Sequence, residues 1–149
     1  METTHDGSTE MVVLDEAFIR ITHQTANDLI VLRWKGYADP TNYRKGLNTG
    51  LDHVQKHGIK RWLADLRHMD AILASEEKWT NEDWFPRLIK AGKLRRMAIL
   101  PSKDFFNKMS VERIMDYSAG AIQFKVGYFP DEPSSMEWLF DEAMSAANA

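Results

Sequence analysis

The chain has 149 residues, no cysteine, and 19 lysines and arginines against 22 aspartates and glutamates, so its formal net charge is −3. A weak negative charge does not favour a general polyanion binder, and the lack of cysteine excludes disulfides, thiolate metal sites and a cysteine nucleophile. About 150 residues are enough for one domain with a sizeable hydrophobic core. We therefore expect a single domain over residues 11–145, preceded by a disordered polar lead over residues 1–10.

No segment of the sequence is typical of export or of membrane insertion. The first ten residues have neither a basic start nor an apolar stretch, so they do not resemble a secretory signal. The longest apolar runs, such as residues 29–32 and 97–100, have four residues, far fewer than the ~20 needed to span a bilayer. Together with the absence of cysteine, this predicts a cytoplasmic protein without membrane insertion.

The first elements are a strand pair and a helix. Residues 18–22 and 29–34 are β-type runs joined by a turn-rich stretch, which predicts a hairpin. Asp39 and Pro40 mark a helix start, because aspartate accepts hydrogen bonds from free amides and proline suits the first helical position. Apolar residues then recur every three or four positions, at Tyr43, Leu47, Leu51 and Val54, before a glycine. This pattern predicts a helix over residues 40–57.

The middle of the chain alternates strand and helix. Residues 59–66 and 94–100 are largely apolar, as expected for strands of a parallel sheet that helices cover on both faces. Between them, Ser75 precedes two glutamates, which is typical of a helix N-cap. Pro86 interrupts this helix, because proline removes a hydrogen bond and clashes with the preceding turn, so we expect a kink near Asp83.

The last third completes the element order. Residues 103–117 predict a broken helix that restarts at Ser110, and alternating apolar residues over 122–128 predict a strand. Ser134 and Glu137 have the S-x-x-E form of a capping box, which predicts a final helix. The order ββαβαβαβα predicts an α/β fold: a mixed, mostly parallel five-stranded sheet with helices packed on it and an antiparallel hairpin at its start.

This element order, with several short motifs, resembles a known family. The motifs are WKG at 34–36, WLAD at 62–65, WTNEDWFPR at 79–87 and MAILP at 97–101. They resemble the STAS-like group of uncharacterised bacterial proteins, which are akin to anti-anti-sigma factors and related in structure to CRAL-TRIO lipid-transfer domains. The resemblance spans about residues 11–140, and it implies a STAS-like fold and, as in the signalling members, regulation through a protein partner.

In those signalling members, an Asp-Ser pair follows the corresponding strand at the start of a helix, and its serine is phosphorylated to release a partner. Ser75 lies at that place here, but Ala74 replaces the acidic residue and Glu76 and Glu77 follow. These glutamates would repel a phosphate, although a helix N-terminus offsets part of the repulsion. We favour an N-cap role for Ser75, with a phosphorylation switch as the alternative.

The strongest candidate site follows the strand at residues 59–66 and consists of Asp65, Arg67, His68 and Asp70. In open α/β sheets, ligands bind beyond the carboxyl ends of the strands. A histidine between carboxylates could act as a general base, yet no nucleophile, oxyanion loop or metal set accompanies it. We therefore expect no catalytic residue and no enzymatic activity.

Two further clusters have ordinary explanations. His53 and His57 have the spacing of two metal ligands on a helix, but no third ligand is marked nearby, so we expect surface histidines near a helix end and neither metal nor cofactor. Five cations cross a helix end, a turn and a strand start, where cations are favoured: Arg87, Lys90, Lys93, Arg95 and Arg96. No aromatic residue alternates with them, so we expect no nucleic-acid partner.

Two functions from different classes follow. The first is a non-enzymatic interaction or regulatory module, which binds an unknown protein partner or a second copy of itself through the helix that begins at Ser75 and the adjoining loops. The alternative is a carrier of a small apolar or lipid-like ligand, in a groove lined by Trp79, Trp84 and Phe85. The candidate ligand or partner surface therefore comprises Asp65, Arg67, His68, Asp70, Ser75, Trp79, Trp84 and Phe85.

Overall fold

A computed structural model describes residues 2–3 and 9–141 of the chain. Within this part, seven strands form one sheet whose spatial order follows the chain. The strands are Glu2–Thr3 (β1), Thr9–Glu16 (β2), Ile19–Gln24 (β3), Leu29–Gly36 (β4), Arg61–Met69 (β5), Arg96–Leu100 (β6) and Lys125–Tyr128 (β7). Pairing is antiparallel from β1 to β4 and parallel from β4 to β7, which confirms the predicted mixed α/β sheet.

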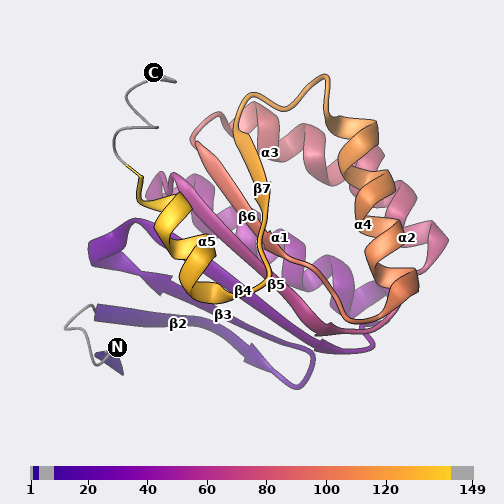
Figure 1. Ribbon diagram of the computed structural model, residues 1–149, viewed down its shortest axis with the longest axis horizontal. Coiled ribbons are helices and arrows are strands. Elements are labelled where there is room, and N and C mark those ends of the chain that lie inside the picture. The colour runs from indigo at the N-terminus through magenta and orange to yellow at the C-terminus, as the bar shows by residue number, and fades with distance from the viewer. Residues whose placement is uncertain (1, 4–8, 142–149) are drawn as a thin grey trace.

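Helices cover both faces of this sheet. They are Thr25–Asn27 (η1, a 3-10 turn), Pro40–His57 (α1), Ala74–Trp79 (α2), Thr80–Trp84 (η2, a π-helical turn), Phe85–Ala91 (α3), Phe105–Ser118 (α4) and Glu132–Leu139 (α5). From β4 to β7 each new strand is added on the same side, so right-handed crossovers place every connecting helix on one face. Helices α1 to α4 therefore cover one face, and α5 covers the other (Figure 1).

The sheet has more strands than the five that the sequence predicted, because β1 and β2 precede the expected hairpin. Strand β2 pairs antiparallel with β3, and its register shifts between Val12 and Leu14. This bulge disrupts the alternation of apolar and polar residues by which a strand is recognised in a sequence. The expected disordered lead is wrong for Glu2–Thr3 and for the first two residues of β2, while residues 1 and 4–8 lie outside the described part.

Strands β5 and β6 carry core residues on both of their faces. Their parallel register pairs Trp62 with Met97 and Ala64 with Ile99. Three of these side chains are buried and Ala64 is partly buried, all on the face that α1 to α4 cover. The opposite face forms a smaller core against Leu139 of α5, from Leu29, Val31, Leu63, Ala98 and Leu100. The parallel strands β4, β5 and β6 thus have two buried faces, as the apolar runs predicted, whereas β7 at the edge has no buried residue.

Helix α1 begins and ends where the sequence predicted. The Asp39 carboxylate accepts a hydrogen bond of 2.8 Å from the Asn42 amide, and Gly58 ends the helix in the left-handed region at φ 64°. Glycine also allows α1 to approach the sheet closely, because a Cβ atom at Gly50 would lie 2.8 Å from the Trp62 ring. The helix therefore packs directly on the tryptophan of β5.

The helical segment after β5 is interrupted as Pro86 predicted. The π-helical turn η2 separates α2 from α3, and the Phe85 amide donates to the carbonyl of Thr80, five residues back. A wide turn of this kind accommodates a proline, which has no amide hydrogen to donate. It also adds a residue to the helix and so changes which side chains face the sheet.

Two helix starts differ from the prediction. Helix α4 is continuous through Ser110, which is buried within it. The helix starts before Ser110, where the Asp104 carboxylate caps it by accepting an amide hydrogen bond of 2.9 Å. Helix α5 is capped by Asp131 rather than by Ser134, whose own amide donates to the Asp131 carboxylate at 2.9 Å. In both cases an aspartate supplies the cap: Asp104 lies inside the expected range of residues 103–117, and Asp131 lies before the expected start at Ser134.

Candidate interaction site

The carboxyl ends of β4, β5 and β6 meet at one edge of the sheet. The Asp70 amide donates to the Gly36 carbonyl at 2.9 Å, and the Ser102 hydroxyl donates to the Met69 carbonyl at 2.7 Å. The side-chain amide of Asn107, on α4, donates to the Asp70 carbonyl at 2.8 Å. The loop that carries the strongest sequence-predicted candidates is thus held from both sides.

Asp65 is the centre of an ion-pair network on the α5 face. Its side chain is 6% exposed, and its oxygens accept hydrogen bonds from Arg67 Nε and Nη2, both at 2.9 Å, and from Arg33 Nη1 at 3.0 Å. Arg33 also donates to both carboxylate oxygens of Glu132, at 2.7 and 3.2 Å. The network therefore ties β4 and β5 to the first turn of α5.

This setting suits a structural carboxylate better than a catalytic one. Burial alone would raise the pKa of Asp65, but hydrogen bonds from Arg67 and the charge of Arg33 outweigh burial and hold the pKa below its ordinary value. A general base works best when its pKa lies near the working pH. An ionised carboxylate shared by two guanidinium groups is therefore a poor proton acceptor.

His68 and Asp70 are exposed and do not join that network. His68 lies at the margin of an open depression of about 820 Å³ between the β2–β3 turn and the ends of β4 and β5. Charged side chains from the β2–β3 turn are already paired there, Asp15 with Arg20 at 2.8 Å and Glu16 with a lysine of α1 at 2.7 Å. The predicted polar residues share one edge but do not converge on an enclosed pocket.

Trp84 and Phe85 are core residues, so their predicted place on a ligand or partner surface is wrong. Their exposed fractions are 2% and 3%. The Trp84 Nε1 atom donates to the Leu47 carbonyl at 2.9 Å, and its ring packs edge-on against Trp62. The π-helical turn η2 contains Trp84 and directly precedes Phe85, and sequence periodicity does not reveal the change of facing that such a turn introduces.

The space beneath these aromatic residues is too small for a lipid-like ligand. A cavity of about 80 Å³ lies between the sheet and the helices, with apolar walls that include Trp34, Trp62, Trp84, Met97 and Ile114. Small-molecule sites usually enclose about 300–1,000 Å³. Core side chains therefore occupy most of the region where the sequence suggested a groove.

Trp79, in contrast, is partly exposed and stacks with charged groups. The Arg44 guanidinium lies over its ring, 5.0 Å from the centroid. Arg44 also donates to the buried Glu76 carboxylate at 2.7 and 3.0 Å. These contacts join α1 to α2, so Trp79 belongs to the seam between the two helices.

Ser75 does not cap the helix, which corrects the N-cap prediction. Helix α2 begins at Ala74 with Leu73 at the N-cap position, and no side chain caps it. The Ser75 hydroxyl is exposed and donates instead to the Glu76 carboxylate at 3.2 Å. The helix begins two residues too early for Ser75 to be its N-cap, and Glu76 and Glu77 supply the negative charge in its first turn.

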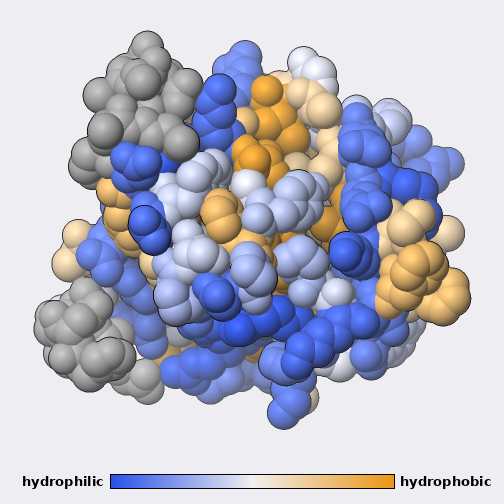
Figure 2. Space-filling model, viewed as in Figure 1, coloured by the Kyte–Doolittle hydropathy of each residue, from blue (hydrophilic) through white to orange (hydrophobic). Residues whose placement is uncertain are grey.

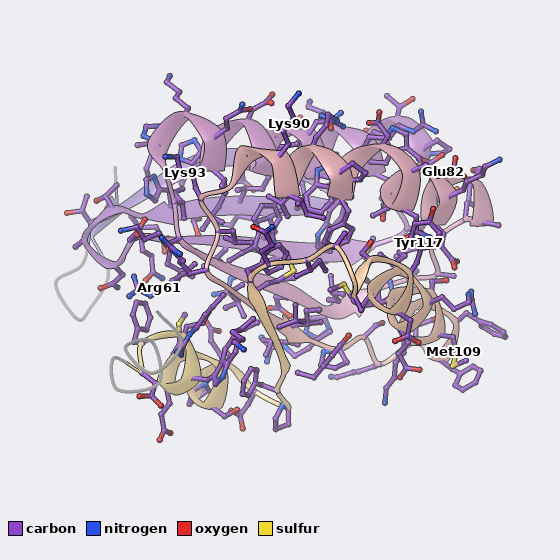
Figure 3. All side chains as sticks on the ribbon, turned by 90° about the horizontal axis from the view of Figure 1, so that it is seen from above. Arg61, Glu82, Lys90, Lys93, Met109 and Tyr117 are labelled. Carbon is purple, nitrogen blue, oxygen red and sulfur yellow. The ribbon has the colours of Figure 1, made fainter. Side chains whose placement is uncertain are left out.

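A surface that the sequence analysis missed runs between α2 and α4. An open groove of about 340 Å³ lies there, which we call the α2–α4 groove, lined by Ala74, Glu77, Lys78, Asn81, Glu82, Arg113 and Tyr117. Arg113 crosses it and donates to the Glu77 carboxylate at 2.8 and 3.1 Å. Tyr117 is 66% exposed and lies on the α4 side, with Glu82 opposite (Figure 3).

Two exposed phenylalanines lie at the start of α4. Phe105 and Phe106 are 67% and 70% exposed, and their rings contact each other edge-on at a centroid distance of 5.6 Å. Figure 2 shows hydrophobic side chains at the margin of the molecule where α4 begins. This Phe105–Phe106 pair can be read in the sequence as two consecutive aromatic residues, but Trp84 and Phe85 form such a pair inside the core, so adjacency alone does not predict exposure.

The five clustered cations do not form one surface. Arg96 is 4% exposed and lies over the Trp138 ring of α5, 5.2 Å from the centroid. Lys90 and Lys93 are exposed on the opposite layer (Figure 3). Arg87 pairs with a carboxylate of its own helical segment at 2.8 Å. The absence of a nucleic-acid partner stays a prediction.

The two histidines of α1 have a third neighbour that lies far from them in the sequence. His53 Nε2 is 2.9 Å from Nδ1 of His23 in β3. In the part of the chain that the structure describes, no three His, Asp or Glu side chains are placed to hold a metal ion.

Comparison with known proteins identifies the fold. No family model and no curated protein matches the sequence. A solved structure of an uncharacterized protein of the DUF3478 family from Shewanella loihica PV-4, which has a SpoIIAA-like fold, superposes with a TM-score of 0.50 at 14% identity and covers 93% of this chain and 98% of that chain. The chain therefore has a SpoIIAA-like fold, which confirms the fold that the STAS-like resemblance implied.

Two further solved structures, both from Pseudomonas aeruginosa, show a weaker similarity. Apo-SiaC has a TM-score of 0.48 at 11% identity, over 80% of this chain and 98% of that chain. The complex of the diguanylate cyclase SiaD with its activator SiaC gives a TM-score of 0.44 at 12% identity, over 81% of this chain and 99% of that chain.

Among the described residues of the present chain, no helix is long and apolar enough to span a bilayer.

Proposed function

We propose that this protein is a non-enzymatic interaction module that binds a protein partner through the α2–α4 groove and the Phe105–Phe106 pair. The observation that carries the proposal is the exposure of these two side chains, 67% and 70%. Full burial of a phenylalanine is favourable by about 1.5–3 kcal/mol, so a partner that covers both gains considerable binding free energy. Contiguous exposed apolar area is the usual mark of such a surface.

The groove supplies the polar part of the proposed interface. Phe106, Arg113 and Tyr117 follow one another at spacings of seven and four residues, so they share one side of α4. Arg113, about two helical turns along α4 from Phe106, forms an ion pair with Glu77, and Tyr117 offers a second aromatic anchor. Aromatic anchors with a polar surround are typical of protein interfaces, and they would select the partner by both shape and charge.

The strand-end residues support a role without catalysis. The ionised Asp65 carboxylate binds Arg33 and Arg67, and Arg33 in turn binds Glu132 in the first turn of α5. Asp65 therefore helps to position α5. The backbone amide and carbonyl of Asp70 form hydrogen bonds that hold the loop at the edge of the sheet.

Photocrosslinking in cells of the native host tests the proposed surface. A benzophenone amino acid at Phe106 or at Tyr117 should capture the same partner, because both positions lie on one side of α4. The same probe at Lys60, which is exposed before β5, is the control and should not capture it. Capture of a second copy of this chain would identify the partner as the protein itself.

A double substitution separates binding from folding. Phe105→Ser with Phe106→Ser should abolish capture from the probe at Tyr117, while the unfolding midpoint stays near that of the unsubstituted chain, because both side chains lie outside the core. Capture that survives the double substitution, or equal capture from Lys60, would contradict the proposed surface.

The carrier alternative has one observation in its favour, the apolar cavity, and its volume of about 80 Å³ argues against a lipid-like ligand. Native mass spectrometry of protein purified from its own host distinguishes the two functions. The interaction module should show the mass of the chain or of an assembly of chains. A bound lipid-like mass would favour the carrier.

A further inference from the structure

Three histidines from two elements meet where α1 ends. His23 lies in β3, and His53 and His57 lie in the last turns of α1. His53 Nε2 and His23 Nδ1 are 2.9 Å apart, a hydrogen bond in which one nitrogen donates and the other accepts. The His57 ring centroid lies 4.2 Å from that of His53 and 5.3 Å from that of His23. The cluster therefore joins the helix to the sheet through imidazole contacts.

We propose that this cluster is a proton-sensitive latch between α1 and the sheet, which holds the last turns of the helix on β3 while the rings are neutral and releases them when the rings are protonated. The hydrogen bond requires a lone pair on one of the two facing nitrogens. If both rings were protonated, two N–H groups would face each other at 2.9 Å and two like charges would be close together. A charge on His57 would add to this repulsion.

The surroundings of the cluster favour its neutral form. Burial first, and then the charge of His57, lower the pKa of His23, while the Asp28 carboxylate before β4 acts in the opposite direction. Burial first, and then His57, His23 and Lys56, lower the pKa of His53 to about 4. The residues paired with His23 on the neighbouring strands β2 and β4 are a methionine and an isoleucine, which bring no charge.

The direction of the pH effect follows from these shifts. The pKa of a histidine in the unfolded chain is about 6.5, so between about pH 6.5 and pH 4 the unfolded chain binds protons that folded His53 does not bind. Stability is therefore fully present above about pH 6.5 and declines as the pH falls through this window. Because the two paired rings interact, they should titrate in coupled steps rather than as independent groups.

Thermal unfolding of the full chain at pH 7.5 and pH 5.0, in the presence of EDTA, tests the latch. Its Tm should fall by roughly 5 °C or more between the two conditions. His53→Gln keeps a hydrogen-bonding side chain but cannot gain the proton, so its fall in Tm should be less than about half of that value. His68→Gln, at an exposed histidine outside the cluster, is the matched control and should fall as the unsubstituted chain does. An equal fall in His53→Gln would overturn the proposal.

A second measurement needs no substitution, so it tests the proposed latch even if His53→Gln does not fold. The imidazole resonances of the unsubstituted protein can be followed by NMR from pH 8 to pH 4. His23 and His53 should both titrate below about 6.5 and should influence each other's shifts. Independent titration of both rings near the ordinary value would overturn the latch, because the contact would then leave the protonation of the rings unchanged.

Discussion

Buried charge is the main feature of this protein at the scale of single residues. Asp65, Glu76 and Arg96 are 4%, 2% and 4% exposed; the two carboxylates are paired with arginines, and Arg96 contacts the carbonyl and the ring of Trp138. Arginines of neighbouring elements bind the two carboxylates, while Arg96 donates to the Trp138 carbonyl of α5. Removing one partner of a buried charge leaves the other unpaired, which is strongly unfavourable. These residues therefore report on how the elements are held together.

Asp65→Asn should lower the free energy of unfolding by about 1–2 kcal/mol at pH 7, because it removes charged hydrogen bonds to Arg33 and Arg67, which are themselves partly exposed. The folded-state pKa of Asp65 lies below the ordinary 3.8, so the stabilisation is present above pH 3.8 and is lost as the pH falls through the lower, folded value. Urea unfolding at pH 7 and pH 2.5 should show the difference shrink.

The matched control for that change is Asp15→Asn. The Asp15 side chain is 57% exposed and pairs with Arg20 on the surface, so its removal should change the free energy of unfolding by about 0.5 kcal/mol or less. Equal losses from the two substitutions would show that the burial of the Asp65 network has no energetic consequence.

Trp84→Ala should destabilise the fold by about 3–5 kcal/mol, because it opens a cavity between α1 and β5 and leaves the Leu47 carbonyl without its indole donor. Trp79→Ala, at a partly exposed position, should cost less than about 2 kcal/mol. Denaturant unfolding of both variants measures the contrast. A larger loss of unfolding free energy for Trp79→Ala than for Trp84→Ala would show that Trp79, and not Trp84, is the core tryptophan of this segment.

At the scale of the element, aspartates rather than serines start the longer helices. The carboxylates of Asp39, Asp104 and Asp131 each accept an amide hydrogen bond from the first turn of the helix that follows, at 2.8 to 2.9 Å. Helix α2 has no side-chain cap and is instead held by the contact of Arg44 with Glu76. Local capping therefore decides where α1, α4 and α5 start, and tertiary contacts stabilise α2.

Two alanine substitutions distinguish these helix starts. Asp104→Ala should lower the free energy of unfolding by about 1 kcal/mol, because the cap of α4 is lost. Ser75→Ala should change it by no more than about 0.5 kcal/mol, since the exposed hydroxyl caps nothing. Chemical denaturation is again the measurement, and a full cap-sized loss at Ser75 would restore the original N-cap interpretation.

At the scale of the whole molecule, one sheet carries two cores of unequal size. The larger lies under α1 to α4, and the smaller lies under α5 alone (Figure 1). Register partners Arg61 and Arg96 hold the C-terminal end of α5, because their side chains donate to the Leu139 and Trp138 carbonyls. Cations at this end of a helix also interact favourably with its dipole. Helix α5 is thus held by arginines at both ends: Arg33 binds Glu132 at its start, and Arg61 and Arg96 bind carbonyls at its end.

Arg96→Met should loosen α5 without unfolding the larger core. It keeps the apolar stem but removes the donor to Trp138, so amide exchange in residues 132–141 should quicken about tenfold or more, while exchange in α1 and α3 changes little. Hydrogen-exchange mass spectrometry measures both regions at once. Arg95→Met, at an exposed neighbour, is the control and should leave α5 unaffected.

Much of the architecture was predictable from local patterns. The bounds of α1 follow from Asp39, Pro40 and Gly58, which act within a few residues, and the apolar runs of β5 and β6 predicted adjacent parallel strands. The meeting of the strand ends followed as well, because parallel neighbours end at the same edge. Strand β2 was missed because its bulge interrupts the expected alternation.

The sequence by itself therefore determined the α/β class, the order of the elements after β2 and the edge at which Asp65 lies. Only the tertiary structure decided that Trp84 is buried, that Arg44 reaches Glu76, that His23 meets His53 and that a groove lies between α2 and α4. The physical reason is the distance along the chain over which each kind of interaction acts. Caps and periodicity act over a few residues, whereas side-chain facing after a π-helical turn and contacts between distant elements depend on how the packed helices and strands come together.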